Sequence, residues 1–125
     1  WDVVQVINRL YPYMPSDLSH YIAEHGYRQK DGLEYIPEYD ADMSRYIEEA
    51  GYAVEELWPF MENVSCPTMI VRGEESTFLS LDDAQNMCNA IPKAVLKEIP
   101  KSSHMPLLEN RDAFIKVIID FLEGL

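Results

Sequence analysis

Hydrophobic positions change their spacing about halfway along the chain. Up to Gly51 they recur every three or four residues in short runs that proline and glycine interrupt, which predicts helices over residues 3–10, 16–26 and 40–51. Between the second and third of these, Asp31-Gly32 is a turn signal, and the aromatic stretch after it contains a proline. This stretch predicts an edge strand or an extended segment.

From Cys66 onward the pattern becomes strand, helix, strand, helix. Apolar runs of strand length occupy residues 67–73 and 94–100, and amphipathic helices are predicted over 81–91 and 110–125. Runs that are apolar throughout are typical of parallel strands covered on both faces. We therefore expect an α/β chain in which residues 67–100 form two neighbouring parallel strands joined by a right-handed helical crossover.

Two helix starts carry a capping signal. Ser16 is expected to cap the second helix, and Ser80 with Asp83 forms a capping-box-like start for the helix over 81–91. The last helix has one face built for burial, formed by Phe114, Val117, Ile118, Phe121 and Leu122.

Composition and net charge argue against some classes of binding partner. The 125 residues are 47% hydrophobic, and 22 acidic against 10 basic residues give a net charge of −12. This charge opposes binding to nucleic acid or to anionic lipid. No run approaches the roughly 18 apolar residues that cross a bilayer, and no basic-then-apolar leader opens the chain, so we expect a soluble, cytoplasmic protein. Because Trp1 stands directly before a helical pattern, the sequence is expected to be part of a longer chain.

Cysteines and histidines give no sign of a metal or a cofactor. Cys66 and Cys88 lie 22 positions apart without a Cys-x-x-Cys motif, which indicates neither a zinc site nor a disulfide framework and favours a reducing compartment. His20 and His25 are five apart on a predicted helix, so they do not share a face as a metal-binding pair would. The prediction is no metal and no cofactor.

The remaining histidine has a more informative setting. His104 lies in "KSSHMPLLENRDAF", in the loop after the second predicted parallel strand. Catalytic groups of α/β proteins sit beyond the carboxyl ends of such strands, and the loop "GEESTFLS" after the first strand should open on the same edge. An imidazole, with an ordinary pKa near ~6.5, can take up and return a proton at neutral pH. The alternative is a surface histidine that makes a local hydrogen bond.

The ordered series "PTMIVRGEESTFLSLDDAQNM" and "AVLKEIPKSSHMPLLENRDAFIKVIIDFL" resembles the last third of the α/β-hydrolase family over about residues 58–123. The resemblance implies a partial α/β-hydrolase fold, with residues 1–57 as a helical cap segment and 58–125 as the C-terminal part of the core, a βαβα unit of a parallel sheet. It also implies that His104 is the general base of a nucleophile-His-acid triad. One departure is Ser103, where many relatives have glycine, because a side chain there requires suitable backbone angles.

Two other departures concern the rest of the triad. No serine of this chain lies in the G-x-S-x-G elbow that carries the family's nucleophile. Many relatives have G-x-x-D after the first strand of this unit, where this chain has Ser76. By resemblance to relatives with G-x-x-S, the acid is Asp40, although a helix N-cap is an equal alternative. Glu75 and Glu74 are local rivals, which are more simply read as solvated loop charges.

These observations predict a serine hydrolase acting on an ester, thioester or lactone, to which this chain contributes His104 and the acid while being inactive alone. The alternatives are a relative with an aspartate nucleophile, such as an epoxide hydrolase or dehalogenase, and a non-catalytic binding or scaffold protein. The expected partners are a small ester-like substrate and either a second copy or a complementing N-terminal half. The tyrosines of the first half are expected to cover a small cap core rather than to line a substrate pocket.

Overall fold

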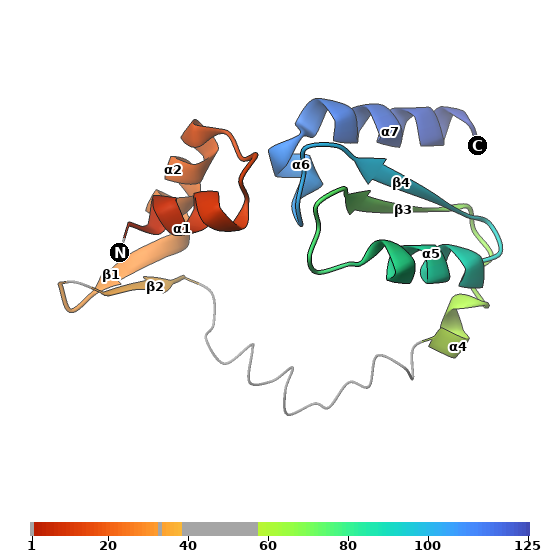
Figure 1. Ribbon diagram of the computed structural model, residues 1–125, viewed down its shortest axis with the longest axis horizontal. Coiled ribbons are helices and arrows are strands. Elements are labelled where there is room, and N and C mark those ends of the chain that lie inside the picture. The colour runs from red at the N-terminus through yellow and green to blue at the C-terminus, as the bar shows by residue number, and fades with distance from the viewer. Residues whose placement is uncertain (1, 33, 39–57) are drawn as a thin grey trace.

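A computed structural model describes residues 2–32, 34–38 and 58–125 of the chain. These residues form an N-terminal unit of helices with a hairpin, and a C-terminal unit in which helices cover both faces of a parallel pair of strands (Figure 1). The α/β class expected from the sequence is confirmed. The predicted helix over 40–51, and Asp40 with it, lies outside the described residues.

The N-terminal unit packs two helices on a hairpin. Its elements are α1 (Val3–Leu10), α2 (Ser16–Gly26), β1 (Tyr27–Lys30) and β2 (Glu34–Pro37). The strands are antiparallel, and Asp31 and Gly32 between them have φ angles of 50° and 84°, the left-handed conformation that Asp-Gly turns favour. Ser16 is the first residue of α2 rather than its cap, because Pro15 occupies the cap position and ends the preceding turn. That expectation was wrong.

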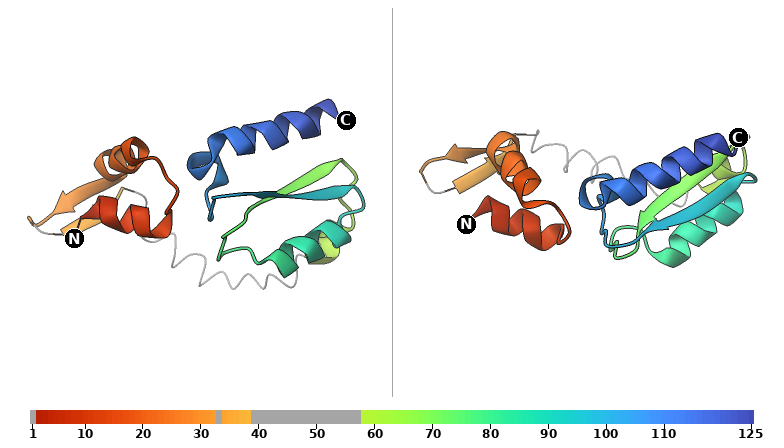
Figure 2. Two further views of the ribbon diagram at one scale, coloured as in Figure 1. Left: turned by 45° about the horizontal axis from the view of Figure 1, so that its top comes forward. Right: turned by 90° about the horizontal axis from the view of Figure 1, so that it is seen from above.

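The C-terminal unit is built on two parallel strands. Its elements are α4 (Trp58–Met61), β3 (Thr68–Gly73), α5 (Leu81–Ala90), β4 (Ala94–Ile99), α6 (Pro106–Glu109) and α7 (Arg111–Glu123). β3 pairs with β4 in parallel from Thr68 opposite Ala94 to Gly73 opposite Ile99, as the sequence predicts. α5 and α7 cover opposite faces of this pair (Figure 2).

The core of this unit is formed by residues of the strands and of α5. Its buried apolar residues are Ile70, Ala84, Ile91 and Ile99. α5 begins where the capping signal places it, since the Ser80 hydroxyl accepts a hydrogen bond from the Asp83 backbone N–H at 3.0 Å.

The segment after His104 has one more element than the sequence predicts. α6 forms a single turn that begins at Pro106, and the Asn110 side chain then caps α7, accepting from Ala113 N at 3.4 Å. Asn110 also donates to the Pro100 carbonyl at 2.7 Å, across the base of the loop. α6 and the Asn110 side chain therefore hold together the two ends of the loop that contains His104.

The carboxyl ends of β3 and β4 both point toward the N-terminal unit (Figure 1). Two hydrogen bonds cross between the units there. The Tyr13 hydroxyl donates to Glu75, and the Ser103 hydroxyl lies 3.4 Å from the Leu10 carbonyl oxygen. The loops after the two parallel strands are thus next to the helices of the first unit.

Candidate active site

His104 lies exposed in the loop between β4 and α6. Its ring stacks on Phe78, from the loop between β3 and α5, with centroids 4.2 Å apart and an interplanar angle of 30°. Phe78 is itself 75% exposed, so the stacked pair is open to solvent in the described structure. The prediction that the two loops share one edge of the sheet is confirmed.

Backbone contacts join the two loops closely. Glu74 N donates to Ile99 O at 2.9 Å, and Glu75 N donates to Ser102 O at 3.0 Å. A Cβ atom at Gly73 would lie 1.9 Å from the Ser103 carbonyl oxygen. Gly73 is therefore required by the close approach of the His104 loop, because an added methyl group would occupy the space of that backbone.

Glu109 also binds the loop that carries His104. Its side chain, only 8% exposed, accepts hydrogen bonds at Oε2 from Ser103 N at 2.8 Å, Ser103 Oγ at 2.7 Å and Met105 N at 3.3 Å. The donors come from the residues on either side of His104. The sequence alone predicts no role for Glu109, although a carboxylate in the first turn after the loop is a visible signal.

Ser103, the residue where many relatives have glycine, fits without strain. The described non-glycine residues with a positive φ angle are Asp31 and Lys101, and Ser103 is not among them. Its hydroxyl is buried against Glu109. The side chain is therefore accommodated and adds a contact that glycine could not make.

The acid candidates are placed differently from one another. Asp40 lies outside the described residues, whereas Glu74 and Glu75 are exposed on the loop after β3. The Glu75 carboxylate accepts the Tyr13 hydroxyl. At the position of the family's usual aspartate, the buried Ser76 hydroxyl accepts from Leu79 N at 3.3 Å, so it stabilises its own loop. Among the described residues, no carboxylate is hydrogen-bonded to the His104 ring.

A buried arginine shapes the loop that carries these residues. The Arg72 guanidinium donates to the carbonyl oxygens of Glu74, Ser76 and Leu79, at 3.1, 3.3 and 2.8 Å. It also forms an ion pair with Glu98 on β4 at 2.5 Å. One side chain thus satisfies three loop carbonyls, which fixes the loop beside His104.

The Tyr13–Glu75 contact changes the acidity of the tyrosine. The hydrogen bond to Glu75 raises the pKa of the Tyr13 hydroxyl above its usual 10.0, and the nearby negative charges of Glu75, Glu74 and Glu109 act in the same direction. Ionised Tyr13 would face carboxylates, so the protonated phenol is favoured.

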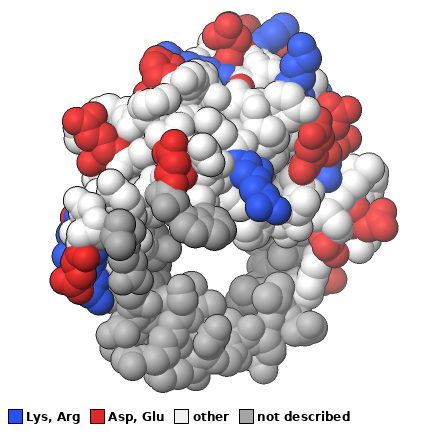
Figure 3. All heavy atoms as spheres, turned by 60° about the vertical axis from the view of Figure 1, so that its left-hand side comes forward, with Lys and Arg blue, Asp and Glu red and all other residues white. Residues whose placement is uncertain are grey.

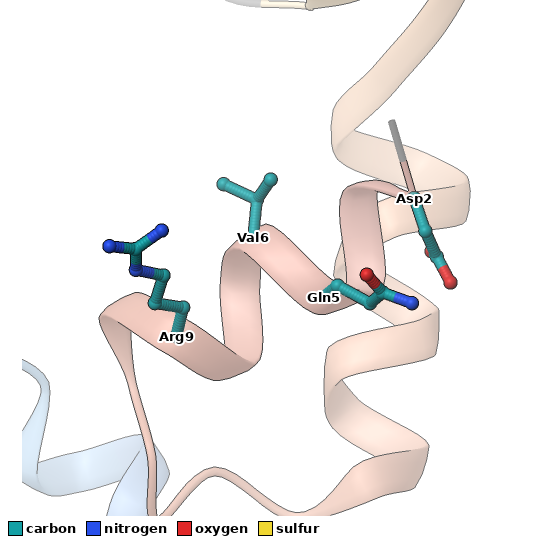
Figure 4. A pocket seen from close by; sticks show the side chains of 4 residues that line it. All are labelled: Asp2, Gln5, Val6 and Arg9. Atoms are coloured by element: carbon teal, nitrogen blue, oxygen red, sulfur yellow. The ribbon is translucent and has the colours of Figure 1, made fainter.

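Two hollows border the helices of the N-terminal unit. One of about 450 Å³ lies between α2 and α6–α7, and its described lining is Pro15, Asp17, Leu18, Leu107, Leu108 and Arg111. A second, of about 470 Å³, follows one face of α1, with Asp2 and Arg9 at its ends and Gln5 and Val6 between them (Figure 4). No described lining of either hollow includes His104.

Charged side chains form no single basic surface on the face shown in Figure 3, where acidic and basic groups are interspersed. Within the described residues, His, Cys, Asp and Glu side chains do not gather into a group of three that could hold a metal ion. None of the described helices has the length and apolar character needed to cross a membrane.

No protein-family model matches the chain. Two proteins are similar to about half of it in sequence. Over 60 residues it is 27% identical to the pimeloyl-(acyl-carrier protein) methyl ester esterase of Chromobacterium violaceum, covering 48% of this chain and 24% of the esterase. Over 64 residues it is 30% identical to the α/β-hydrolase domain-containing protein VTE7 of Arabidopsis thaliana, covering 51% of this chain and 19% of VTE7.

Solved structures extend the likeness to nearly the whole chain. The crystal structure of E-2-(acetamidomethylene)succinate hydrolase matches 97% of this chain with a TM-score of 0.76 and 25% identity, over 44% of its own length. The chain is similar to α/β-hydrolases and has part of their fold. The thioesterase domain from the curacin biosynthetic pathway shares the fold, with a TM-score of 0.71 over 93% of this chain and 40% of that domain.

This chain matches only part of the length of each relative. The chain spans less than half of each of these hydrolases. No serine within the 125 residues has the G-x-S-x-G setting of an α/β-hydrolase nucleophile.

Proposed function

We propose that this chain provides the general base, His104, of a serine hydrolase that cleaves an ester, thioester or lactone. The observation that carries the proposal is an exposed imidazole on a tightly held loop at the carboxyl end of β4, in an α/β-hydrolase structure. His104 would take the proton from a serine hydroxyl during attack on the carbonyl and return it to the leaving group. The serine belongs to residues beyond this sequence, and the chain is inactive by itself.

The triad acid in this proposal is Asp40. Two contacts support it: the Glu75 carboxylate accepts the Tyr13 hydroxyl, and Ser76, which stands where many relatives have aspartate, bonds within its own loop. A triad acid holds the imidazole in the correct tautomer and stabilises the imidazolium. Residues 1–57 are proposed to act as the cap over this site, and the free Cys66 and Cys88 accord with a reducing, cytoplasmic location.

The test compares the 125-residue chain with the complete hydrolase that contains it. The chain alone should not hydrolyse p-nitrophenyl acetate, and a fluorophosphonate should label the complete enzyme on a serine outside residues 1–125. In the complete enzyme His104→Asn should lower kcat by about 10⁴ or more, with KM nearly unchanged. Turnover by the pure chain, or full activity of the His104 variant, would disprove the proposal.

The acid is tested in the same enzyme. Asp40→Asn should lower kcat by orders of magnitude without a comparable loss of stability, whereas the matched variant Glu75→Gln should have a mild effect. If Asp40→Asn lowers the melting temperature and leaves kcat near that of the unmodified enzyme, Asp40 is a helix cap and the acid lies on the Glu74–Glu75 loop.

Ser76 favours one competing function, a binding or scaffold protein that keeps the α/β-hydrolase fold without turnover, because the family's usual carboxylate is missing there. In that case the complete protein would bind an ester-like ligand, yet neither fluorophosphonate labelling nor hydrolysis would be detected. Turnover of an epoxide or a haloalkane without fluorophosphonate labelling would indicate the alternative class with an aspartate nucleophile.

A further inference from the structure

Glu109 is a buried acidic residue that the proposed triad chemistry does not use. It lies at the end of the single-turn helix α6, five positions after His104, and its Oε2 accepts bonds from Ser103 N, Ser103 Oγ and Met105 N. Its Oε1 is buried without a partner among the described residues. The carboxylate is thus turned entirely inward, toward the loop backbone.

Burying the Glu109 carboxylate is by itself unfavourable for folding. A buried carboxylate is unfavourable unless hydrogen bonds replace its water, and here one oxygen remains without a described partner. The donors it does satisfy are two loop N–H groups that no helix or strand satisfies. Hydrogen bonds to a charged acceptor are stronger than those between neutral groups. The loop is therefore fixed at the residues before and after His104.

Backbone contacts with the loop after β3 hold the His104 loop independently of Glu109. Glu75 N donates to the Ser102 carbonyl, and the backbone at Gly73 packs directly on residues 102 and 103. Ser102, Ser103 and Glu109 are buried, while His104 between them is exposed. The backbone is constrained at its neighbours, and only the imidazole remains accessible.

We propose that Glu109 is a positioning residue for His104. By anchoring the N–H groups of residues 103 and 105, it sets the direction in which the His104 side chain leaves the backbone. It acts through the peptide chain and differs from the triad acid, which acts on the ring. The proposal rests on the role of His104 as general base, and a misplacement of about 1 Å at such a base can cost roughly 10²-fold in rate.

The first experiment uses the 125-residue chain and needs no activity. Amide hydrogen exchange is measured at Ser103 and Met105, together with the ring-current shift that Phe78 imposes on the His104 ring protons. Glu109→Ala should accelerate exchange at both amides by about tenfold or more, as expected when bonds to a charged acceptor are lost. The ring-current shift should shrink as the loop samples other positions. Glu123→Ala, which removes an exposed glutamate from α7, is the matched control and should change neither signal.

Two milder variants keep the proposal testable if Glu109→Ala does not fold. Glu109→Gln retains the shape and one carbonyl acceptor, and Ser103→Ala removes one of the three bonds while leaving both N–H donors in place. Both should give exchange rates between those of the unmodified chain and of Glu109→Ala. Unchanged exchange at residues 103 and 105 in Glu109→Gln and Ser103→Ala would overturn the proposal.

The second experiment measures kinetics in the complete hydrolase. Glu109→Ala should lower kcat by about 10² with little change in KM, and Glu109→Gln should recover most of that loss. A merely structural role predicts instead that kcat falls in proportion to the folded fraction, and that result would overturn the positioning role. If His104→Asn leaves kcat unchanged, the proposed function fails, whereas the exchange rates still decide whether Glu109 holds the loop.

Discussion

Gly73 is the residue at which the loops after β3 and β4 meet. It ends β3, is buried, and has the carbonyl oxygens of Ser102 and Ser103 within 2.6 and 1.9 Å of the place where a Cβ would stand. These neighbours are backbone atoms, so they cannot rotate away as a side chain would. A side chain at Gly73 must push the whole His104 loop from β3.

Gly73→Ala is therefore expected to destabilise the chain by about 1–3 kcal/mol, the usual range for an overpacked core. Urea unfolding measures the free energy, and the ring-current shift between Phe78 and His104 reports the displacement of the loop. Under the proposed function, the activity of the complete protein should fall further than the loss of folded protein explains.

Gly26→Ala is the matched control for this substitution. A Cβ at Gly26 would meet only Ile22 Cγ2, at 3.8 Å, which is an ordinary contact. Replacing this glycine at the end of α2 should be neutral or stabilising by up to about 1 kcal/mol, because the unfolded chain loses freedom. Equal effects of the two substitutions would show that the contact at Gly73 does not constrain the His104 loop.

At the scale of elements, the sequence predicted what depends on local pattern. The parallel strands and α5 follow from apolar runs and from the Ser80 cap, and each is confirmed. α6 was not predicted, because one helical turn has no periodicity to read. The anchoring by Glu109 and the loop contacts of Arg72 were missed for a related reason. Each depends on backbone groups brought together only after β3 and β4 pair.

The contact between Tyr13 and Glu75 links the N-terminal helices to the loop after β3, and it should make stability depend on pH. The pKa of Tyr13 is raised above 10.0 in the folded chain, chiefly by its hydrogen bond to Glu75. A raised folded pKa means that this bond contributes its full stability below the unfolded pKa of about 10 and loses it as pH rises through the folded pKa. Tyr13→Phe should therefore be less stable than the unmodified chain at pH 8, with a smaller difference above pH 10.

Urea unfolding of both proteins at about pH 8 and about pH 11 measures this difference, in which other titrating groups cancel. Tyr35→Phe, which removes the hydroxyl of an exposed tyrosine on β2, is the control and should show a small difference at both values. A stability difference for Tyr13→Phe that grows above pH 10 would contradict the assigned direction of the pKa shift.

At the scale of the whole molecule, the described sheet is small for its class. It consists of β3 and β4 alone among the described residues, although an average sheet has about five or six strands. The sequence predicted this incompleteness through the resemblance of residues 58–123 to one end of a larger fold.

Apolar side chains remain exposed on the outer part of this unit. Ile115, Ile119 and Leu122, spaced to share one face of α7, are 37%, 47% and 59% exposed, and Val95 on β4 is 41% exposed. The first two border a hollow of about 300 Å³ along the helix. Exposed apolar side chains on one helix face favour association.

We therefore expect the 125-residue chain alone to associate with a second copy in a concentration-dependent way, and light scattering or sedimentation measures the mass. The net charge of −12 opposes this association by repulsion between copies, whereas apolar contact favours it. Raising the ionic strength from about 0.01 M to about 0.15 M shortens the Debye length from roughly 30 to 8 Å and should strengthen association.

Ile119→Gln separates the two forces, because it removes apolar surface at the centre of the exposed α7 face without changing the net charge. It should weaken association by about tenfold in Kd, since burying an isoleucine side chain is worth roughly 1.5–3 kcal/mol and half of this side chain is already covered in the monomer. Glu123→Gln, on the same helix, lowers the repulsion slightly and should not weaken association. If the unmodified chain stays monomeric at every concentration and salt level, the exposed α7 face does not drive self-association. The partner expected from the sequence must then be sought in a complementing N-terminal segment.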